Sequence, residues 1–277
     1  LDKLPGSLQE PILRELDPIK EIFLRQRAPR IAVLGEAGIA LPALINALAG
    51  RTVLSAPLLR GPWTAVRGAG TVEWADLRES GSSPPEPADL YLFVGSVHAG
   101  MVPDARRAAE VLASAASREG GRPAGLAVMV FGDRGETSAV LSALADAGAS
   151  ASVVFSTHLA RRGIEAGFPA EERSALGDRL CDYLPEDAQL ELARFLAARG
   201  AQARLAGTVL KSFGAVAGVI GMQPLPLADF PVLLSLQMFM VSLIVYVSGR
   251  DFSPRLAGEF AASLGIGFGA GIVFREA

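Results

Sequence analysis

Residues 30–51 place an apolar strand, a glycine-containing loop and an apolar helix in immediate succession. The strand covers 31–34, the loop 35–40 and the helix 43–49. Phosphate-binding loops occupy this setting, because the backbone N–H groups of the loop and of the first helical turn point at the anion. The segment therefore predicts an α/β domain with this loop at a strand-to-helix junction.

The side chains that would hold a phosphate are missing from the loop. Leu41 stands at the Lys position of the P-loop pattern, and Pro42 stands at the Ser/Thr position that binds magnesium. Pro42 has no N–H to donate, although proline is well tolerated in a first helical turn. No Lys occurs between Lys20 and Lys211, and Asn46 is the only Asn, so shifting the alignment restores nothing. We expect the helix to persist and the anion site to be degraded.

Composition excludes several classes of function. The net charge of −3 gives no general attraction for nucleic acid. The single cysteine, Cys181, excludes an internal disulfide, fits a cytoplasmic protein and is expected in the core. Half of the 277 residues are hydrophobic, which indicates a deeply buried region, a membrane contact or an obligate partner.

Strands and helices alternate between residues 30 and 184, after a helical lead-in over 1–29. Several of the strands are continuous apolar runs, as in parallel sheets that are covered on both faces. The alternation predicts a doubly wound, mostly parallel α/β domain. Further strands are predicted at 71–75, 90–94, 126–131 and 152–156, helices at 6–27 (with a break or kink at Pro18), 103–118, 137–147 and 169–183, and a loop over 56–70.

The sequence from 185 to 277 predicts an all-α hydrophobic domain. A long helix is expected over 186–211, with Arg194 and Lys211 on its polar side, followed by uncharged runs that include 231–249. That run just reaches the ~20 apolar residues of a membrane span. Asp229 would be costly deep in lipid, so a shallow hairpin fits better than two spans, and a hairpin buried against other subunits is the alternative. The residues predicted to contact the membrane or another subunit are Phe213, Phe230, Leu233, Met238, Phe239 and Ile244.

Segments at both ends carry a family resemblance. They read LINALAG (44–50), LPEDAQLELAR (184–194), QPLPLADFPVLLSLQMFMV (223–241), GRDFS (249–253) and FGAGIVFREA (268–277). With them the chain resembles the bacterial Era/dynamin-like GTPases that have a C-terminal hydrophobic helical domain of unknown function. The resemblance implies a P-loop GTPase-like domain over 30–184 and that helical domain over 185–277. It also implies an early stop, since the family's helical domain usually extends past a FREA-like segment.

The resemblance, carried over position by position, is to a degenerate member of the family. Gly35 and Gly38 match P-loop glycines, while Ala40 replaces the Gly before the Lys position. The remaining motif positions fall on Thr64 (the switch Thr that helps hold magnesium), Asp76 and Glu79 (the ends of Asp-x-x-Gly, with Glu for Gly), Asp133 (the base-reading Asp) and Ser156 (the loop that brushes the base). Asp76 and Glu79 are expected to be a solvated remnant of the switch.

The residues favour a catalytically inactive GTPase-like scaffold or assembly protein without cofactor or metal. It would act at the cytoplasmic face of the membrane, with a protein partner or a second copy of itself and no nucleic acid. One alternative is a divergent GTP-binding protein or GTP hydrolase that uses GTP or GDP with Mg, and another is a structural subunit of a larger membrane complex. His98 and His158 lack metal-ligand spacing and are expected as loop histidines.

Overall fold

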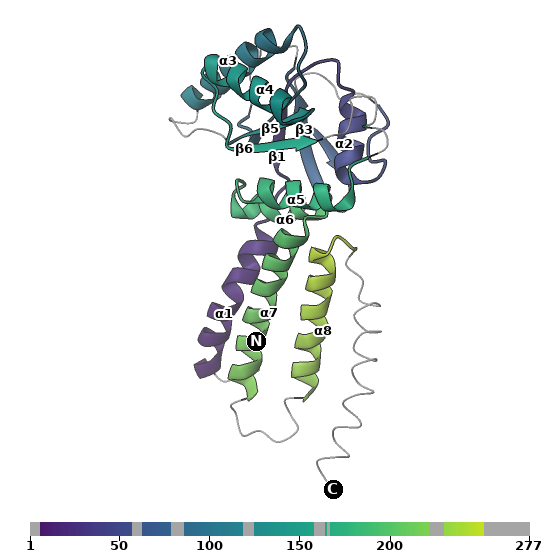
Figure 1. Cartoon of the computed structure of the whole chain (residues 1–277). Coiled ribbons are helices and arrows are strands. Elements are labelled where there is room, and N and C mark those ends of the chain that lie inside the picture. Colours follow the sequence, from purple (N-terminus) through teal and green to yellow (C-terminus); the bar gives the residue numbers. More distant parts are fainter. Residues whose placement is uncertain are drawn as a thin grey trace. The chain divides into compact units, whose positions relative to one another are not determined.

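The computed structural model describes residues 6–56, 63–78, 86–118, 125–157, 164, 167–221 and 230–251. The chain forms two compact units, Arg27–Ala201 and Leu1–Gln26 together with Gln202–Ala277 (Figure 1). We expected a boundary near 184. The division instead falls at Ala201, because the helix over 186–195 packs on the sheet of the first unit.

The first unit is an α/β domain with a six-stranded sheet in the order β2-β3-β1-β4-β5-β6. All neighbouring strands are parallel except β2, which is antiparallel to β3, so the expected mostly parallel sheet is confirmed. The strands are β1 (Arg30–Gly35), β2 (Thr64–Arg67), β3 (Thr71–Asp76), β4 (Leu90–Gly95), β5 (Gly125–Phe131) and β6 (Val153–Thr157).

Strand β2 lies within the stretch that was predicted to be a loop. It is a short edge strand, and Val66 is paired with Val72 of β3. The pairing with β3 forms this strand, since its four residues have too weak a local pattern to predict one.

Helices cover both faces of the sheet. On one face α3 (Met101–Arg118) and α4 (Arg134–Asp146) pack on a core that includes Tyr91 and Phe93. On the opposite face α6 (Glu186–Phe195) packs on β3, where the rings of Trp74 and Phe195 lie 6.2 Å apart. Next to α6 is α5 (Ala170–Cys181), whose Cys181 is fully buried as expected, and α2 (Leu41–Ala49) follows β1.

The helix expected over 186–211 is two helices, α6 and α7 (Arg199–Gly221). Ala197 between them has a left-handed backbone, with φ of 52°. The carboxylate of Asp178 on α5 accepts hydrogen bonds from the N–H groups of Gly200 and Ala201, which fixes the start of α7. Arg194, expected on a polar face, is buried and paired with Glu191. A contact with a distant helix thus creates the break.

The second unit contains α1 (Gly6–Leu24), most of α7, and α8 (Phe230–Val247). Ile19, Val209, Phe213 and Leu243 form its described core. Helix α1 continues through Pro18, so of the break or kink expected there the break is absent. Within the described residues, no helix combines the length and the apolar character that crossing a bilayer requires.

Candidate functional site

The carboxyl ends of β1, β3 and β4 form the candidate site. Strand β1 lies between β3 and β4, and after β3 the chain crosses over to the other side of β1. Ligands of open α/β sheets bind at such a reversal of strand order, outside the carboxyl ends of the strands. The loop over 36–40 leaves β1 at this point, so the structure places it where an α/β protein is expected to hold a ligand.

Gly35 is required by the turn that begins this loop. Its φ is +99°, and a Cβ built on it would lie 2.2 Å from the carbonyl oxygen of Val94 on β4. The next residue, Glu36, donates its N–H to the same oxygen at 2.8 Å. The fold alone therefore accounts for glycine here, and Gly35 is not by itself evidence of phosphate binding.

Arg78 lies against the loop from the end of β3. Its side chain is almost fully buried, with the residue 7% exposed. Nη1 donates to the carbonyl oxygens of Glu36 at 3.2 Å and of Ile39 at 2.5 Å. A phosphate cradle needs N–H groups that point at the anion. Here two loop carbonyls face a cation supplied by the protein itself.

Asp76 holds the other side of the same guanidinium. Nε and Nη2 of Arg78 donate to its two carboxylate oxygens at 2.8 and 2.7 Å. The Asp76 side chain is 22% exposed, so the expectation of a solvated remnant was wrong for this residue. Glu79, the other half of that expectation, lies outside the described residues.

A second polar cluster lies beside the loop, after β4. The hydroxyl of Ser96 donates to Glu36 Oε2 at 2.8 Å, and Glu36 is buried. His98 places Nδ1 2.8 Å from the carbonyl oxygen of Ser96 and Nε2 3.2 Å from Oδ2 of Asp104 on α3. Both ring nitrogens therefore face oxygen atoms. Burial raises the pKa of the Asp104 carboxyl above its ordinary value, and the neighbouring His98 partly offsets that rise.

The start of α2 has no group that could replace the missing Lys. The Leu41 side chain is buried, with the residue 2% exposed, so an apolar group packs inward at the Lys position. Pro42 occupies the first turn, and Ala40 caps the helix without a side-chain hydrogen bond. Gly38 is exposed in the turn before it.

The residues expected near a nucleotide base or a magnesium ion have other structural roles. Asp133 is the N-cap of α4, and its Oδ1 accepts the N–H of Glu136 at 2.9 Å in a capping box. Ser156 is exposed on β6, two strands away from β4. Thr64 begins β2 and is paired with Trp74 in the sheet. All three therefore lie outside the cluster around Arg78.

The residues expected to make membrane or subunit contacts fall into three groups. Phe213 is buried within the helical unit, and its ring lies 5.8 Å from that of Phe239, which remains 50% exposed. Met238 and Ile244 are half-buried. Phe230 and Leu233 lie on α8, but their side chains are outside the described part of the chain.

Sequence reasoning missed the residues that fill the site, namely Arg78, Glu36 and Asp104. No local pattern singles them out, because each becomes significant only through a neighbour on another strand or helix. Among the described residues, no group of three or more His, Cys, Asp or Glu side chains could hold a metal ion. No protein-family model matches the chain, and no curated protein matches it either.

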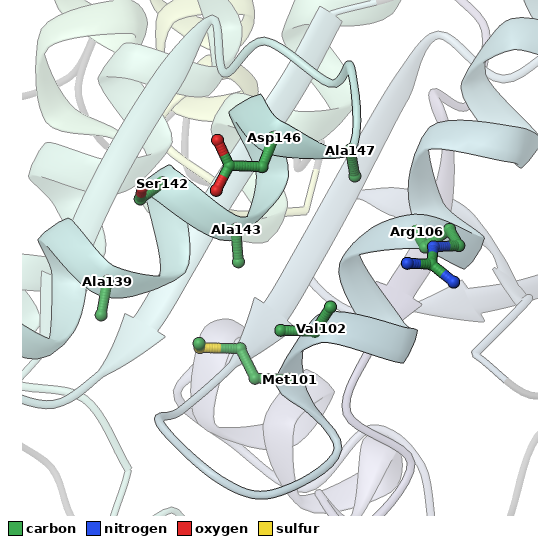
Figure 2. A pocket seen from close by; sticks show the side chains of 8 residues that line it. All are labelled: Met101, Val102, Arg106, Ala139, Ser142, Ala143, Asp146 and Ala147. Carbon is green, nitrogen blue, oxygen red and sulfur yellow. The ribbon is translucent and has the colours of Figure 1, made fainter.

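Two open depressions lie elsewhere on the α/β unit. A groove of about 390 Å³ runs between α3 and α4, lined by Met101 and Val102 on one side and by Ala139 and Ala143 on the other (Figure 2). A larger pocket of about 620 Å³ flanks α2, on the side where this helix meets α5.

Proposed function

We propose that this protein is a catalytically inactive, GTPase-like scaffold or assembly component. The observation that carries the proposal is the position of Arg78, whose guanidinium binds the loop carbonyls of Glu36 and Ile39 and both oxygens of Asp76. The strand–loop–helix unit at the reversal of strand order supports a GTPase-like frame. The Arg78 guanidinium lies in the loop where a phosphate would bind, and this supports the loss of nucleotide binding.

Electrostatics supports the absence of turnover. Phosphoryl transfer depends on positioning and on neutralising the charge of the phosphates, which an ammonium group and magnesium normally provide. Leu41 and Pro42 supply neither a cation nor a metal ligand. Asp76, at the first position of the Asp-x-x-Gly segment, is paired with Arg78, and the buried Glu36 carboxyl lies in the loop itself. A triphosphate here would meet carbonyl and carboxylate oxygens.

The exposed apolar surface supports a scaffold role. On the α/β unit, Val102 is exposed in the groove between α3 and α4, and Val97 is exposed in the segment before α3. On the helical unit, Leu210 is 55% exposed and shares a face of α7 with Gly207, Gly214 and Gly218. A Cβ built on any of these three glycines meets no described atom within 4 Å, so the face is open to close packing. We assign the α/β unit to a protein partner and the helices to a membrane or a second copy.

Nucleotide binding tests the first half of the proposal. The purified full chain is titrated calorimetrically with GDP and GTP, with and without Mg²⁺. We expect no saturable binding that requires Mg²⁺ up to about 1 mM nucleotide. The double variant Leu41→Lys/Pro42→Ser should gain no such Mg²⁺-dependent binding, since Arg78 still holds the loop carbonyls. Micromolar binding that requires Mg²⁺ would overturn the proposal in favour of a divergent GTP-binding protein.

Assembly tests the second half. Light scattering after size exclusion and flotation with anionic vesicles should reveal either self-association or lipid binding. Leu210→Ser should weaken whichever is found, while Leu24→Ser, a change at another exposed leucine of the helical unit, serves as the matched control. A monomer that ignores vesicles would contradict the role assigned to the helices.

A further inference from the structure

We propose that the pocket on the flank of α2 binds a small anion that carries a phosphate group, through the guanidinium groups of Arg51 and Arg173. The pocket has a volume of about 620 Å³ and is bounded by α2, by the segment that follows it, and by the start of α5. It uses neither the loop over 36–40 nor Arg78, although Pro42 also lines it. The two arginines have no part in the proposed loss of nucleotide binding.

Arg173 provides the first charge. Its Nε is shielded from solvent and has no hydrogen-bond acceptor among the described residues. Because Nε is itself shielded, a ligand in the pocket would bind the two terminal nitrogens of this guanidinium, Nη1 and Nη2. A phosphate oxygen matches the planar donor geometry of a guanidinium.

Gly50 makes room for this guanidinium. It ends α2 with φ of +68°, and a Cβ built on it would lie 2.2 Å from Nη1 of Arg173. Any other residue would require this guanidinium to move from its present position. The glycine therefore serves both the turn and the position of the cation.

Arg51 provides the second charge from the residue that follows Gly50. It is exposed, lines the same pocket and has no acidic partner among the described residues. Asn46 holds the segment that follows Arg51. Its side chain accepts hydrogen bonds from the N–H groups of Val53 and Leu54 and donates one to the carbonyl oxygen of Leu54, all at 2.9 Å or less. The segment thus has a fixed position.

The charge count favours phosphate over a single carboxylate. Two arginines line the pocket and no acidic side chain lines it among the described residues, so a dianion is the matching ligand. Thr52 and Ser55 add hydroxyl donors to the lining. The volume exceeds that of one phosphate, which leaves space for a larger phosphorylated molecule.

Calorimetry with inorganic pyrophosphate and with inorganic phosphate tests the site on the full chain. Wild type should bind pyrophosphate saturably, and Arg51→Gln and Arg173→Gln should each weaken binding roughly tenfold or more. Arg67→Gln, at an exposed arginine on β2 outside the pocket, should leave it unchanged. Tighter binding of pyrophosphate than of phosphate would point to a larger phosphorylated ligand as the natural one.

Two results would overturn the inference. If wild type does not bind either probe saturably, Arg173 only stabilises the carboxyl end of α2, and the inference is overturned. Binding that survives both Arg51→Gln and Arg173→Gln overturns it too. Should Arg173→Gln fail to fold, the exposed Arg51 still decides the question. A GDP response that needs Mg²⁺ and persists in Arg51→Gln would refute the proposed function instead, and leave this site untouched.

Discussion

Arg78 donates two parallel hydrogen bonds to Asp76, from Nε to Oδ1 at 2.8 Å and from Nη2 to Oδ2 at 2.7 Å. A bidentate pair of this kind is the strongest geometry for an arginine and a carboxylate. Its third nitrogen, Nη1, joins the end of β3 to the loop after β1. One side chain therefore occupies the loop and pairs with the carboxylate of Asp76.

Arg78→Gln should lower the free energy of unfolding by about 2–4 kcal/mol, because it leaves the Asp76 carboxylate and two loop carbonyls without their partner. The protein has two tryptophans, Trp63 and Trp74, and both belong to the α/β unit, so their fluorescence during denaturant unfolding reports this unit. Arg67→Gln should stay within about 0.5 kcal/mol of wild type.

The double variant Arg78→Gln/Asp76→Asn completes a thermodynamic cycle for this pair. Its loss of stability should be clearly smaller than the sum of the two single losses, since removing both charges leaves neither unpaired. Additive losses would mean that Arg78 and Asp76 do not interact in solution.

Gly35→Ala should destabilise the α/β unit more than Gly148→Ala does. Both glycines have a left-handed backbone, with φ of +99° and +90°, so both substitutions carry about 1–2 kcal/mol of backbone strain. Only at Gly35 does the added Cβ collide with backbone, while at Gly148 it meets nothing within 4 Å. We expect an additional loss of about 1–3 kcal/mol for Gly35→Ala in the same fluorescence assay. Equal losses would show that the turn can move away from Val94.

Asp133→Ala should reduce stability by about 0.5–2 kcal/mol through loss of the N-cap of α4. Glu136→Gln is the matched variant, because Gln can still accept the N-cap N–H and complete the capping box. We expect it to be near wild type in thermal melts. A change at Asp133 that altered a nucleotide response without altering stability would contradict the structural role given to this residue.

Asp104→Asn should change how stability depends on pH. The pKa of Asp104 is raised in the folded protein, so the folded state binds more protons than the unfolded state above the ordinary Asp value of 3.8. This carboxyl therefore costs stability progressively as pH rises from 3.8 through its folded pKa. The variant lacks that loss, so its stability relative to wild type should increase over this window. His98, Arg107 and Glu36 face the group and are kept in both proteins. A pH-independent difference between their melting temperatures would show that burial does not perturb Asp104.

Local periodicity predicted most elements of the α/β unit to within a few residues, because buried parallel strands and amphipathic helices have patterns of their own. It failed where a distant partner creates the structure. The break between α6 and α7 depends on Asp178 of α5. Arg194 is buried and paired with Glu191, three residues earlier on α6, in a position set by the packing of α6 on β3. Glu191 in turn accepts the N–H of Thr71 on β3 at 2.6 Å, a contact across 120 positions of sequence.

The sequence by itself determined which groups a phosphate loop lacks, because Leu41 and Pro42 have no charge and no hydroxyl in any conformation. Only the tertiary structure decided what fills the loop instead. The position of Arg78 depends on the parallel pairing of β1 with β3, which brings the ends of two strands together from positions about 40 residues apart. The chemistry of a side chain is set by its own atoms, whereas its partner is set by the packing of strands and helices around it.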